Sequence, residues 1–359
     1  MRIGFDAKRY FFNQTGLGNY SRMLIDGLKH HFPENDYLLF SPKSPALSVE
    51  NIVTPQGFQP FWRQWGIINQ FKDENLDIYH GLSAELPLKR FKKTKTVVTI
   101  HDLIFLRYPQ YYPFIDRKIY KYKTQKAVEN ADKIVCVSQV TANDLNRFFL
   151  FETSKTEVLH FDCNPIFYSK KTDDELAKFR LRYNMPNQFL LIVSKFEKRK
   201  NHLSILKAIV DKNIDIPLVL VGKHGDSYDS VNQFIKKNEL NKKCQIFTTI
   251  PTEDLPYFYQ AAYASIFPSE YEGFGIPVLE SMAGGTPVLT TKNSSMAEIG
   301  GNASLYFDAH NTEEIAEAIE TVFQAEERNL ITSKIPEQLK KFNHQHILNQ
   351  YITMYKSVL

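Results

Sequence analysis

The chain has 359 residues, of which 43% are hydrophobic and 23% are charged, and its formal net charge is +4. This balance is that of a soluble globular protein of about two domains, and so mild a charge does not by itself indicate a nucleic-acid partner. No apolar run is long enough to cross a bilayer, and the amino-terminal residues lack the apolar stretch of a signal peptide, so we expect a cytoplasmic protein. Three widely spaced cysteines form no metal or redox motif, so we expect buried free thiols.

Short strand-like runs alternate with amphipathic helical stretches along the chain. In the first half we expect strands at residues 3–6, 37–40, 77–80, 96–100, 133–137 and 157–160, and helices at 18–31, 60–74, 113–130 and 139–149. In the second half we expect strands at 189–194, 217–222, 245–248, 264–268 and 287–290, and helices at 202–211, 230–237, 252–260, 276–283 and 312–325. This α/β alternation predicts two parallel sheets with helices on both faces, and such sheets bind ligands at the carboxyl ends of their strands.

The two halves are divided by residues 164–187, a charged segment with two prolines and little strand signal. We therefore expect an amino-terminal domain over residues 1–165 and a carboxyl-terminal domain over residues 170–340. In the last stretch, residues 345–358, an apolar side chain recurs every four positions at Ile347, Tyr351 and Tyr355. This spacing predicts a helix with one apolar face.

The most informative segment is the one that follows the strand at 264–268. It holds Glu272, Gly-Phe-Gly and a proline, and then Glu280 early in the predicted helix. Glycines let backbone N–H groups approach a ligand closely, and a helix amino terminus beside them favours anions. A carboxylate can accept two hydroxyl hydrogen bonds, which suits a ribose or hexose diol. The alternative is an ordinary helix start whose acids favour the helix dipole.

The spacing of eight between these two glutamates resembles the E-x7-E motif of glycosyltransferase family 4, and the likeness extends over nearly the whole chain. The resemblance implies the GT-B fold, in which two Rossmann-like domains with parallel sheets face a cleft. It implies that Glu280 holds the ribose hydroxyls and Glu272 the hydroxyls of the donor sugar. The backbone of Gly273, Phe274 and Gly275 would contact the sugar or diphosphate. A final helix, at about residues 341–359, would pack back on the amino-terminal domain.

A basic loop follows the strand at 189–194. Its residues Lys195, Arg199 and Lys200 stand at the carboxyl end of a buried strand, where fixed cations could stabilise a leaving diphosphate. The run resembles the family's R-K-N loop, which implies that Arg199 and Lys200 bind phosphate and that Lys195 is a second candidate. The chain has no Asp-x-Asp motif, so we expect no metal ion and no other cofactor. A solvated basic loop is the alternative.

Three motifs of the first half resemble family loops on the acceptor side. The Gly-Leu-Gly-Asn-Tyr run resembles a loop over the donor phosphate and acceptor, although an ordinary helix start is the alternative. The run from His80 to Pro87, which holds Glu85, resembles a loop that faces the acceptor. A His-Asp pair ends the strand at 96–100. The resemblance implies that the histidine of this pair contacts the donor sugar near the reacting centre and is catalytic, together with Glu272, Arg199 and Lys200. The candidate residues of this half are Gly16, Gly18, Tyr20, His80, Glu85 and His101.

The resemblance implies a retaining hexosyltransferase that moves a sugar from a nucleotide sugar to a saccharide or lipid-linked saccharide. GDP-mannose is the preferred donor because the His-Asp and Arg-Lys-Asn versions resemble bacterial mannosyltransferases of surface polysaccharides; UDP and dTDP sugars stay open. Cations and aromatic side chains mix at residues 107–126. This mixture fits either core packing with a solvated face or peripheral contact with the inner face of the membrane, and no nucleic-acid motif is present. The alternatives are an NAD-dependent oxidoreductase, which the missing dinucleotide fingerprint disfavours, and a non-catalytic nucleotide or sugar binder.

Overall fold

The structure, a computed structural model, describes residues 1–13, 15–45, 50–55, 62–91 and 93–359. The chain forms two compact units. The first unit consists of Met1–Asp162 together with Phe342–Leu359, and the second consists of Cys163–Lys341. Each unit is described by itself.

The first unit is built on a sheet with the strand order β3-β2-β1-β4-β5-β6-β7, and each described pair is parallel. Its strands are β1 (Arg2–Asp6), β2 (Asp36–Phe40), β3 (Ile52–Val53), β4 (Ile78–Gly81), β5 (Lys95–Ile100), β6 (Lys133–Cys136) and β7 (Thr156–Val158). The order reverses between β1 and β4, so the loops after these two strands emerge side by side at the carboxyl edge of the sheet.

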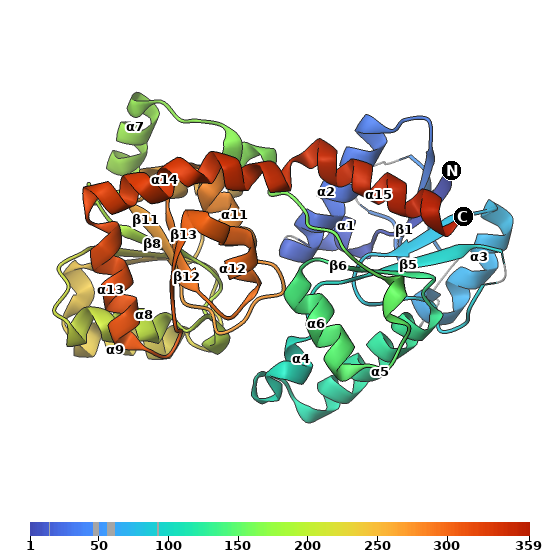
Figure 1. Cartoon of the computed structure of the whole chain (residues 1–359), viewed down its shortest axis with the longest axis horizontal. Helices are drawn as coiled ribbons and strands as arrows, with labels where there is room; N and C mark the ends of the chain where they lie inside the picture. The colour runs from blue at the N-terminus through green and yellow to red at the C-terminus, as the bar shows by residue number, and fades with distance from the viewer. Residues whose placement is uncertain (14, 46–49, 56–61, 92) are drawn as a thin grey trace. The chain divides into compact units, whose positions relative to one another are not determined.

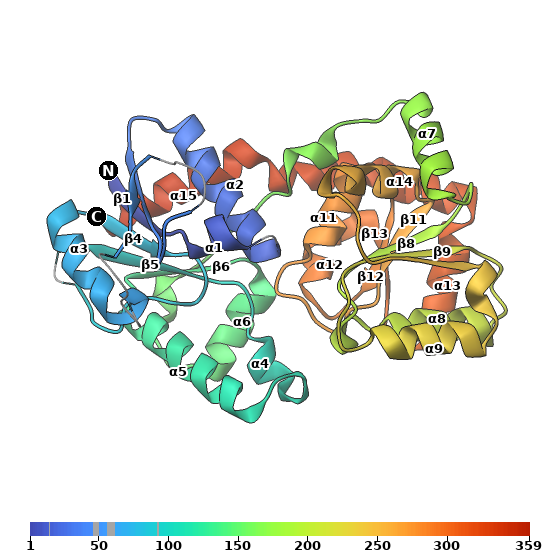
Figure 2. The same cartoon turned by 180° about the vertical axis from the view of Figure 1, so that it is seen from behind.

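Helices cover both faces of this sheet. They are α1 (Lys8–Phe12), α2 (Gly16–His31), α3 (Ile67–Glu74), α4 (Ile104–Arg107), α5 (Phe114–Asn130), α6 (Gln139–Phe148) and α15 (His344–Val358). Helices α2 and α15 lie on one side of the sheet and α5 and α6 on the other (Figures 1 and 2). The helix predicted at 60–74 begins outside the described residues; its described part is a π-helical turn at Trp62–Gly66 followed by α3.

Helix α15 is fastened to this unit by buried polar groups as well as by its apolar face. The Tyr351 hydroxyl lies 3.0 Å from the Tyr20 hydroxyl, and the Tyr355 hydroxyl lies 2.7 Å from Nδ1 of His80. The hydroxyl of Thr99, on β5, is 2.7 Å from that of Tyr20 and 2.8 Å from Nε2 of His80. Buried polar groups must be paired, so this network fixes the position of α15 against α2 and the sheet.

The second unit contains a sheet with the strand order β10-β9-β8-β11-β12-β13, again parallel. Its strands are β8 (Leu190–Val193), β9 (Leu218–Val221), β10 (Cys244–Phe247), β11 (Ala264–Phe267), β12 (Val288–Thr291) and β13 (Ser304–Phe307). Its helices are α7 (Asp173–Tyr183), α8 (His202–Asp211), α9 (Tyr228–Lys237), α10 (Leu255–Ala261), α11 (Ile276–Ala283), α12 (Ser295–Gly300), α13 (Thr312–Val322) and α14 (Ala325–Leu339). Helices α8, α9 and α13 lie on one side of this sheet and α11 and α14 on the other (Figure 1).

The segment 164–187, expected as a division between halves, contains helix α7. Thr172 caps this helix and Glu175 bonds back to the cap, so both ends of a capping box are present. The sequence analysis also did not name β13, α12 and α14. Helix α14 is polar and contains Pro336, which hides its helical pattern.

The three cysteines, Cys136, Cys163 and Cys244, are free and buried, as expected. In the described part of the chain, no helix is both long and apolar enough to cross a membrane.

Candidate functional site

Two loops of the second unit emerge at the point where its strand order reverses. Strands β8 and β11 are neighbours, with Leu190 paired to Ala264, although β9 and β10 lie between them in the sequence. The loop after β8 carries the predicted cations, and the loop after β11 carries Glu272. Parallel sheets bind ligands beside the carboxyl ends of strands at such a reversal, so the topology brings the two predicted motifs to one place.

The loop after β11 turns sharply into helix α11. Gly275 precedes the helix with φ 116°, a backbone conformation that residues other than glycine rarely adopt. A Cβ atom there would lie 3.0 Å from Cγ of Met296. Pro277 stands in the first turn of α11, where no partner for its missing N–H is needed. The side chain of Phe274 is buried.

Glu272 is held by both predicted phosphate-binding residues. Its Oε2 lies 3.1 Å from Nη1 of Arg199, and its Oε1 forms an ion pair with Nζ of Lys200. Arg199 also pairs with Glu197 at 2.9 Å, and Glu197 pairs with Lys195 at 3.0 Å. The sequence predicts that the cations bind phosphate and that Glu272 binds the donor sugar. The structure joins Lys195, Glu197, Arg199, Glu272 and Lys200 into one chain of ion pairs, here called the ion-pair chain.

Backbone contacts hold the two loops together around this chain. The N–H of Glu270 donates to the carbonyl of Arg199 at 2.9 Å, and the Ser295 hydroxyl donates to the carbonyl of Glu272 at 2.7 Å. Burial alone would raise the pKa of Glu272, but the Lys200 ammonium and the Arg199 guanidinium outweigh it and lower the pKa to about 2. The Glu272 carboxylate is therefore charged at neutral pH. Its ion pairs hold the Lys200 and Arg199 side chains in place.

The contacts of Glu280 differ from those of Glu272. It stands in the second turn of α11, is buried, and accepts a 2.9 Å hydrogen bond from the hydroxyl of Tyr259, on α10. Burial raises its pKa from 4.5 to about 7, and the Tyr259 hydrogen bond opposes this shift. The contact with Tyr259 could not be predicted from the sequence, because nothing in the spacing of α10 and α11 indicates that the two side chains meet.

This raised pKa has a consequence for stability. Because the pKa of Glu280 is higher in the folded state than in the unfolded state, the free energy of unfolding decreases as pH rises from 4.5 through about 7. Replacing Glu280 with glutamine should therefore stabilise the protein relative to the wild type by on the order of 3 kcal/mol more at about pH 8.5 than at about pH 5. Urea denaturation at both pH values measures this, with the exposed Glu320→Gln as control. An equal stability difference at both pH values would contradict it.

Among the first-unit candidates, Gly16 is the residue with open space around it. It begins helix α2, and a Cβ atom built on it would meet no atom of the described residues within 4 Å. Gly18 has a packing reason instead, since a Cβ atom there would lie 1.8 Å from the carbonyl oxygen of Asn13. Tyr20 and His80 are fully buried in the network that holds α15. The structure therefore gives these two side chains a packing role, and their expected contact with an acceptor stays a prediction.

His101 follows β5 and is oriented by its neighbours. Its Nε2 lies 2.9 Å from the carbonyl oxygen of Leu82, which can only accept, so Nε2 carries the proton and Nδ1 the lone pair of the neutral ring. Burial lowers the pKa of His101 to about 4; the Leu82 carbonyl opposes this shift and nearby Arg9 adds to it. A neutral imidazole with a defined tautomer is suited to accept a hydrogen bond from a hydroxyl group.

Glu85 belongs to a second group of ion pairs at the strand reversal of the first sheet. Arg63 lies 2.8 Å from Glu85 and also pairs with Asp6, the last residue of β1. Lys123 lies 3.2 Å from the same glutamate. Burial would raise the pKa of Glu85, but Arg63 and Lys123 lower it, so this carboxylate is charged. Its environment is a partly buried cluster of charges.

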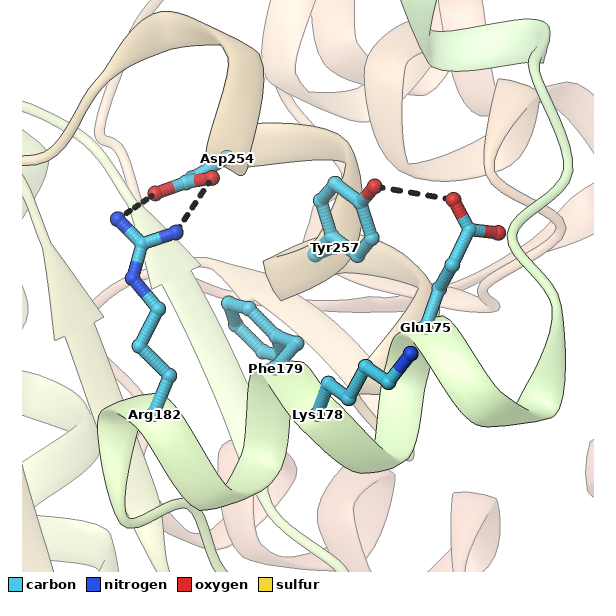
Figure 3. Close-up of a pocket in the computed structure, with 6 residues that line it drawn as sticks. All are labelled: Glu175, Lys178, Phe179, Arg182, Asp254 and Tyr257. Atoms are coloured by element: carbon cyan, nitrogen blue, oxygen red, sulfur yellow. Dashed lines mark hydrogen bonds and ion pairs between the residues drawn. The ribbon is translucent and has the colours of Figure 1, made fainter.

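A shallow hollow lies elsewhere in the second unit, between α7 and α10 (Figure 3). Its lining side chains largely satisfy one another, since Arg182 pairs with Asp254 at 3.0 Å and Tyr257 donates to Glu175 at 3.3 Å. It contains no residue of the ion-pair chain, and we assign it no role. Within the described residues, no cluster of three or more His, Cys, Asp or Glu side chains could hold a metal ion.

Known families match both units of the chain. The family described as "Glycosyltransferase Family 4" matches residues 25–160, and the one described as "Glycosyl transferases group 1" matches residues 173–341. The chain is 29% identical to the O-antigen chain mannosyltransferase B of Escherichia coli, over 82% of this chain and 77% of that protein. It is 24% identical to the O-antigen chain mannosyltransferase RfbU of Salmonella typhimurium, over 69% of this chain and 63% of that protein.

Solved structures share the fold over the whole chain. A sucrose-phosphate synthase from Thermosynechococcus elongatus superposes with a TM-score of 0.78 and 17% identity, covering 100% of this chain and 99% of the other. The Anabaena protein HepE, in complex with UDP and glucose, superposes with a TM-score of 0.77 and 18% identity, covering 99% and 100%. With two parallel-sheet units, the fold is GT-B, and the chain belongs to the group 1 glycosyltransferases of family 4, enzymes that transfer hexosyl groups.

Proposed function

We propose that this enzyme is a retaining, metal-independent mannosyltransferase that uses GDP-mannose to extend a saccharide or lipid-linked saccharide during surface polysaccharide synthesis. The likeness to two O-antigen mannosyltransferases supports mannose and the polysaccharide. The observation that supports binding of a nucleotide-sugar donor is the ion-pair chain at the strand reversal of the second sheet. Within it, Arg199 and Lys200 both pair with Glu272, beside a glycine-lined helix start.

In this proposal the cations act on the leaving group. Arg199 and Lys200 stabilise the charge that develops on the diphosphate as the glycosidic bond breaks. Because both are already fixed by Glu272, little reorganisation is needed when the donor arrives. Donor binding replaces part of the Glu272 contact with phosphate oxygens, which leaves the carboxylate able to accept from the sugar hydroxyls. Glu280 binds the ribose diol in place of the Tyr259 hydroxyl.

The first unit contributes His101. Its neutral ring presents Nδ1 to a hydroxyl group of the transferred sugar, and its Nε2–H stays on the Leu82 carbonyl. Gly16, with open space around it, lets the amino terminus of α2 approach an anionic group of a substrate. The leaving phosphate accepts the acceptor's proton on the same face, so the protein supplies positioning and charge stabilisation rather than a nucleophile.

A screen of nucleotide sugars tests the proposed function. We expect GDP-mannose to raise the melting temperature more than UDP-glucose, UDP-galactose or dTDP sugars, because binding to the folded state stabilises it by mass action. Release of GDP, measured with and without saccharide acceptors, separates an enzyme from a binder. A larger shift and turnover with a UDP sugar would replace the donor, and no turnover with any donor would refute the proposal.

Metal independence is tested by chelation. We expect turnover to be unchanged by EDTA, because fixed cations rather than Mg²⁺ neutralise the diphosphate in this mechanism. Adding Mg²⁺ or Mn²⁺ after EDTA should restore nothing, because nothing is lost. Complete loss of turnover with EDTA, recovered by either ion, would refute this part of the proposal.

A lipid-linked acceptor would determine where in the cell the enzyme acts. We propose that the enzyme acts in the cytoplasm at the inner face of the membrane, as a peripheral protein. A lipid-linked saccharide presents its reactive end at the headgroup surface, so an enzyme that docks there meets the acceptor at a high local concentration.

A further inference from the structure

The first half of helix α5 exposes a continuous apolar face, here called the α5 face. It consists of Phe114, Ile115, Ile119 and Tyr122, whose exposed fractions are 64%, 70%, 45% and 56%. At roughly 100° per residue these positions fall within one side of the helix. The face is therefore a surface feature of an ordered helix and not a scatter of single exposed residues.

This face points away from the core of the first unit. The second half of α5 buries Thr124, Ala127 and Val128, which lie on the opposite side of the helix. Core packing thus explains the buried side and leaves the α5 face without a function in folding. Soluble proteins rarely expose large apolar side chains in contiguous groups unless the group meets a partner.

Cations accompany the α5 face. Lys118 lies within it, with Nζ 5.3 Å from the centre of the Phe114 ring, and Arg117 lies 5.5 Å from the same ring. Lys118 and Lys121 are exposed, and neither forms an ion pair with any described residue. Further along the helix the pattern changes, because Lys123 pairs with Glu85 and Lys126 with Glu129. Only the cations beside the apolar face remain available to an anionic partner.

We propose that the α5 face docks on an anionic lipid bilayer, with its apolar side chains in the headgroup region and Lys118 and Lys121 on lipid phosphates. Charge complementarity favours a bilayer, because aromatic, aliphatic and cationic side chains alternate on one exposed helix, as they do at membrane interfaces. This inference rests on the proposed function, since it supplies the surface through which the enzyme reaches a lipid-linked acceptor.

Vesicle flotation tests the docking. The wild type should float with vesicles of phosphatidylglycerol and phosphatidylethanolamine, float much less with phosphatidylcholine alone, and lose binding as salt is raised. The charge variant Lys118→Glu/Lys121→Glu should bind anionic vesicles at least about tenfold more weakly. The apolar variant Phe114→Ser/Ile115→Ser/Ile119→Ser should lose binding to a similar extent. All substituted positions are exposed, so unchanged circular dichroism and melting temperature are expected.

Matched controls carry the same changes elsewhere. Lys236→Glu/Lys237→Glu, on the exposed side of α9, and Leu181→Ser, 83% exposed on α7, should float as the wild type does. Equal flotation of the α5 variants and the wild type, or no flotation of the wild type, would overturn the docking. So would a wild-type dimer in sedimentation that the apolar variant dissociates, because the face would then join two copies of the chain.

Turnover keeps the two proposals separable. On a water-soluble acceptor the α5 variants should retain wild-type turnover, because no α5-face residue belongs to the proposed site. If flotation fails while turnover persists, only the docking is wrong. If the wild type floats as expected but turns over no nucleotide sugar, the proposed function is wrong and the docking of the α5 face on lipid still stands.

Discussion

Replacing Lys200 with methionine is expected to lower kcat by a factor of about 10²–10³, because the substitution removes one of two fixed cations beside the leaving diphosphate. Methionine keeps most of the side chain's length, so the packing change is small. Lys200 lies in a loop that is already ordered by its backbone bonds, and the loss should appear in turnover more than in KM. Steady-state kinetics with the preferred donor measures both parameters.

A structural effect must be separated from this chemical one. Without Lys200, Glu272 loses one of its two cations and is left partly buried, which costs stability. The double variant Lys200→Met/Glu272→Gln removes this unpaired charge and should recover melting temperature without recovering turnover. Lys198→Met, an exposed neighbour in the same loop, should change neither. Recovery of turnover in the double variant would show that Lys200 acts only by neutralising Glu272.

The sequence predicted the parallel sheets because their strands are apolar runs bounded by helices. Thus β8, β9 and β11 coincide with expected strands, and the two motif loops follow β8 and β11 as expected. Elements with weak patterns were missed. Strand β13 is short and partly exposed along its length, and α12 is six residues long, so neither has enough periodic positions to stand out.

Contacts between distant segments could not be predicted. That Glu272 pairs with Arg199 and Lys200 depends on β8 lying next to β11, and no local pattern encodes this strand order. The same limit explains Tyr20 and His80, which stand in motifs that the sequence predicts to face an acceptor but lie inside the core. Their burial depends on Tyr351 and Tyr355, which come from the other end of the chain.

Replacing each of the two glutamates with glutamine should separate their roles. Glu280→Gln should weaken free GDP and intact donor by similar factors, about 2 kcal/mol or roughly thirtyfold, because both ligands carry the ribose that it binds. Glu272→Gln should leave GDP affinity intact or strengthen it, because the carboxylate that holds Arg199 and Lys200 no longer competes with the diphosphate. This substitution should instead lower the affinity for the intact donor or the turnover, because both depend on the contact between Glu272 and the sugar.

Titration calorimetry with GDP and with a non-transferable donor analogue, on the wild type and both variants, measures the six affinities. Tyr259→Phe is a matched control for Glu280. It removes the hydroxyl that donates to the Glu280 carboxylate and leaves the carboxylate itself, so ribose binding should persist. If Glu272→Gln loses free GDP as severely as Glu280→Gln, the assignment of sugar and ribose is wrong. If neither variant changes either ligand, both glutamates are ordinary acids of a helix start, and the donor binds to other residues.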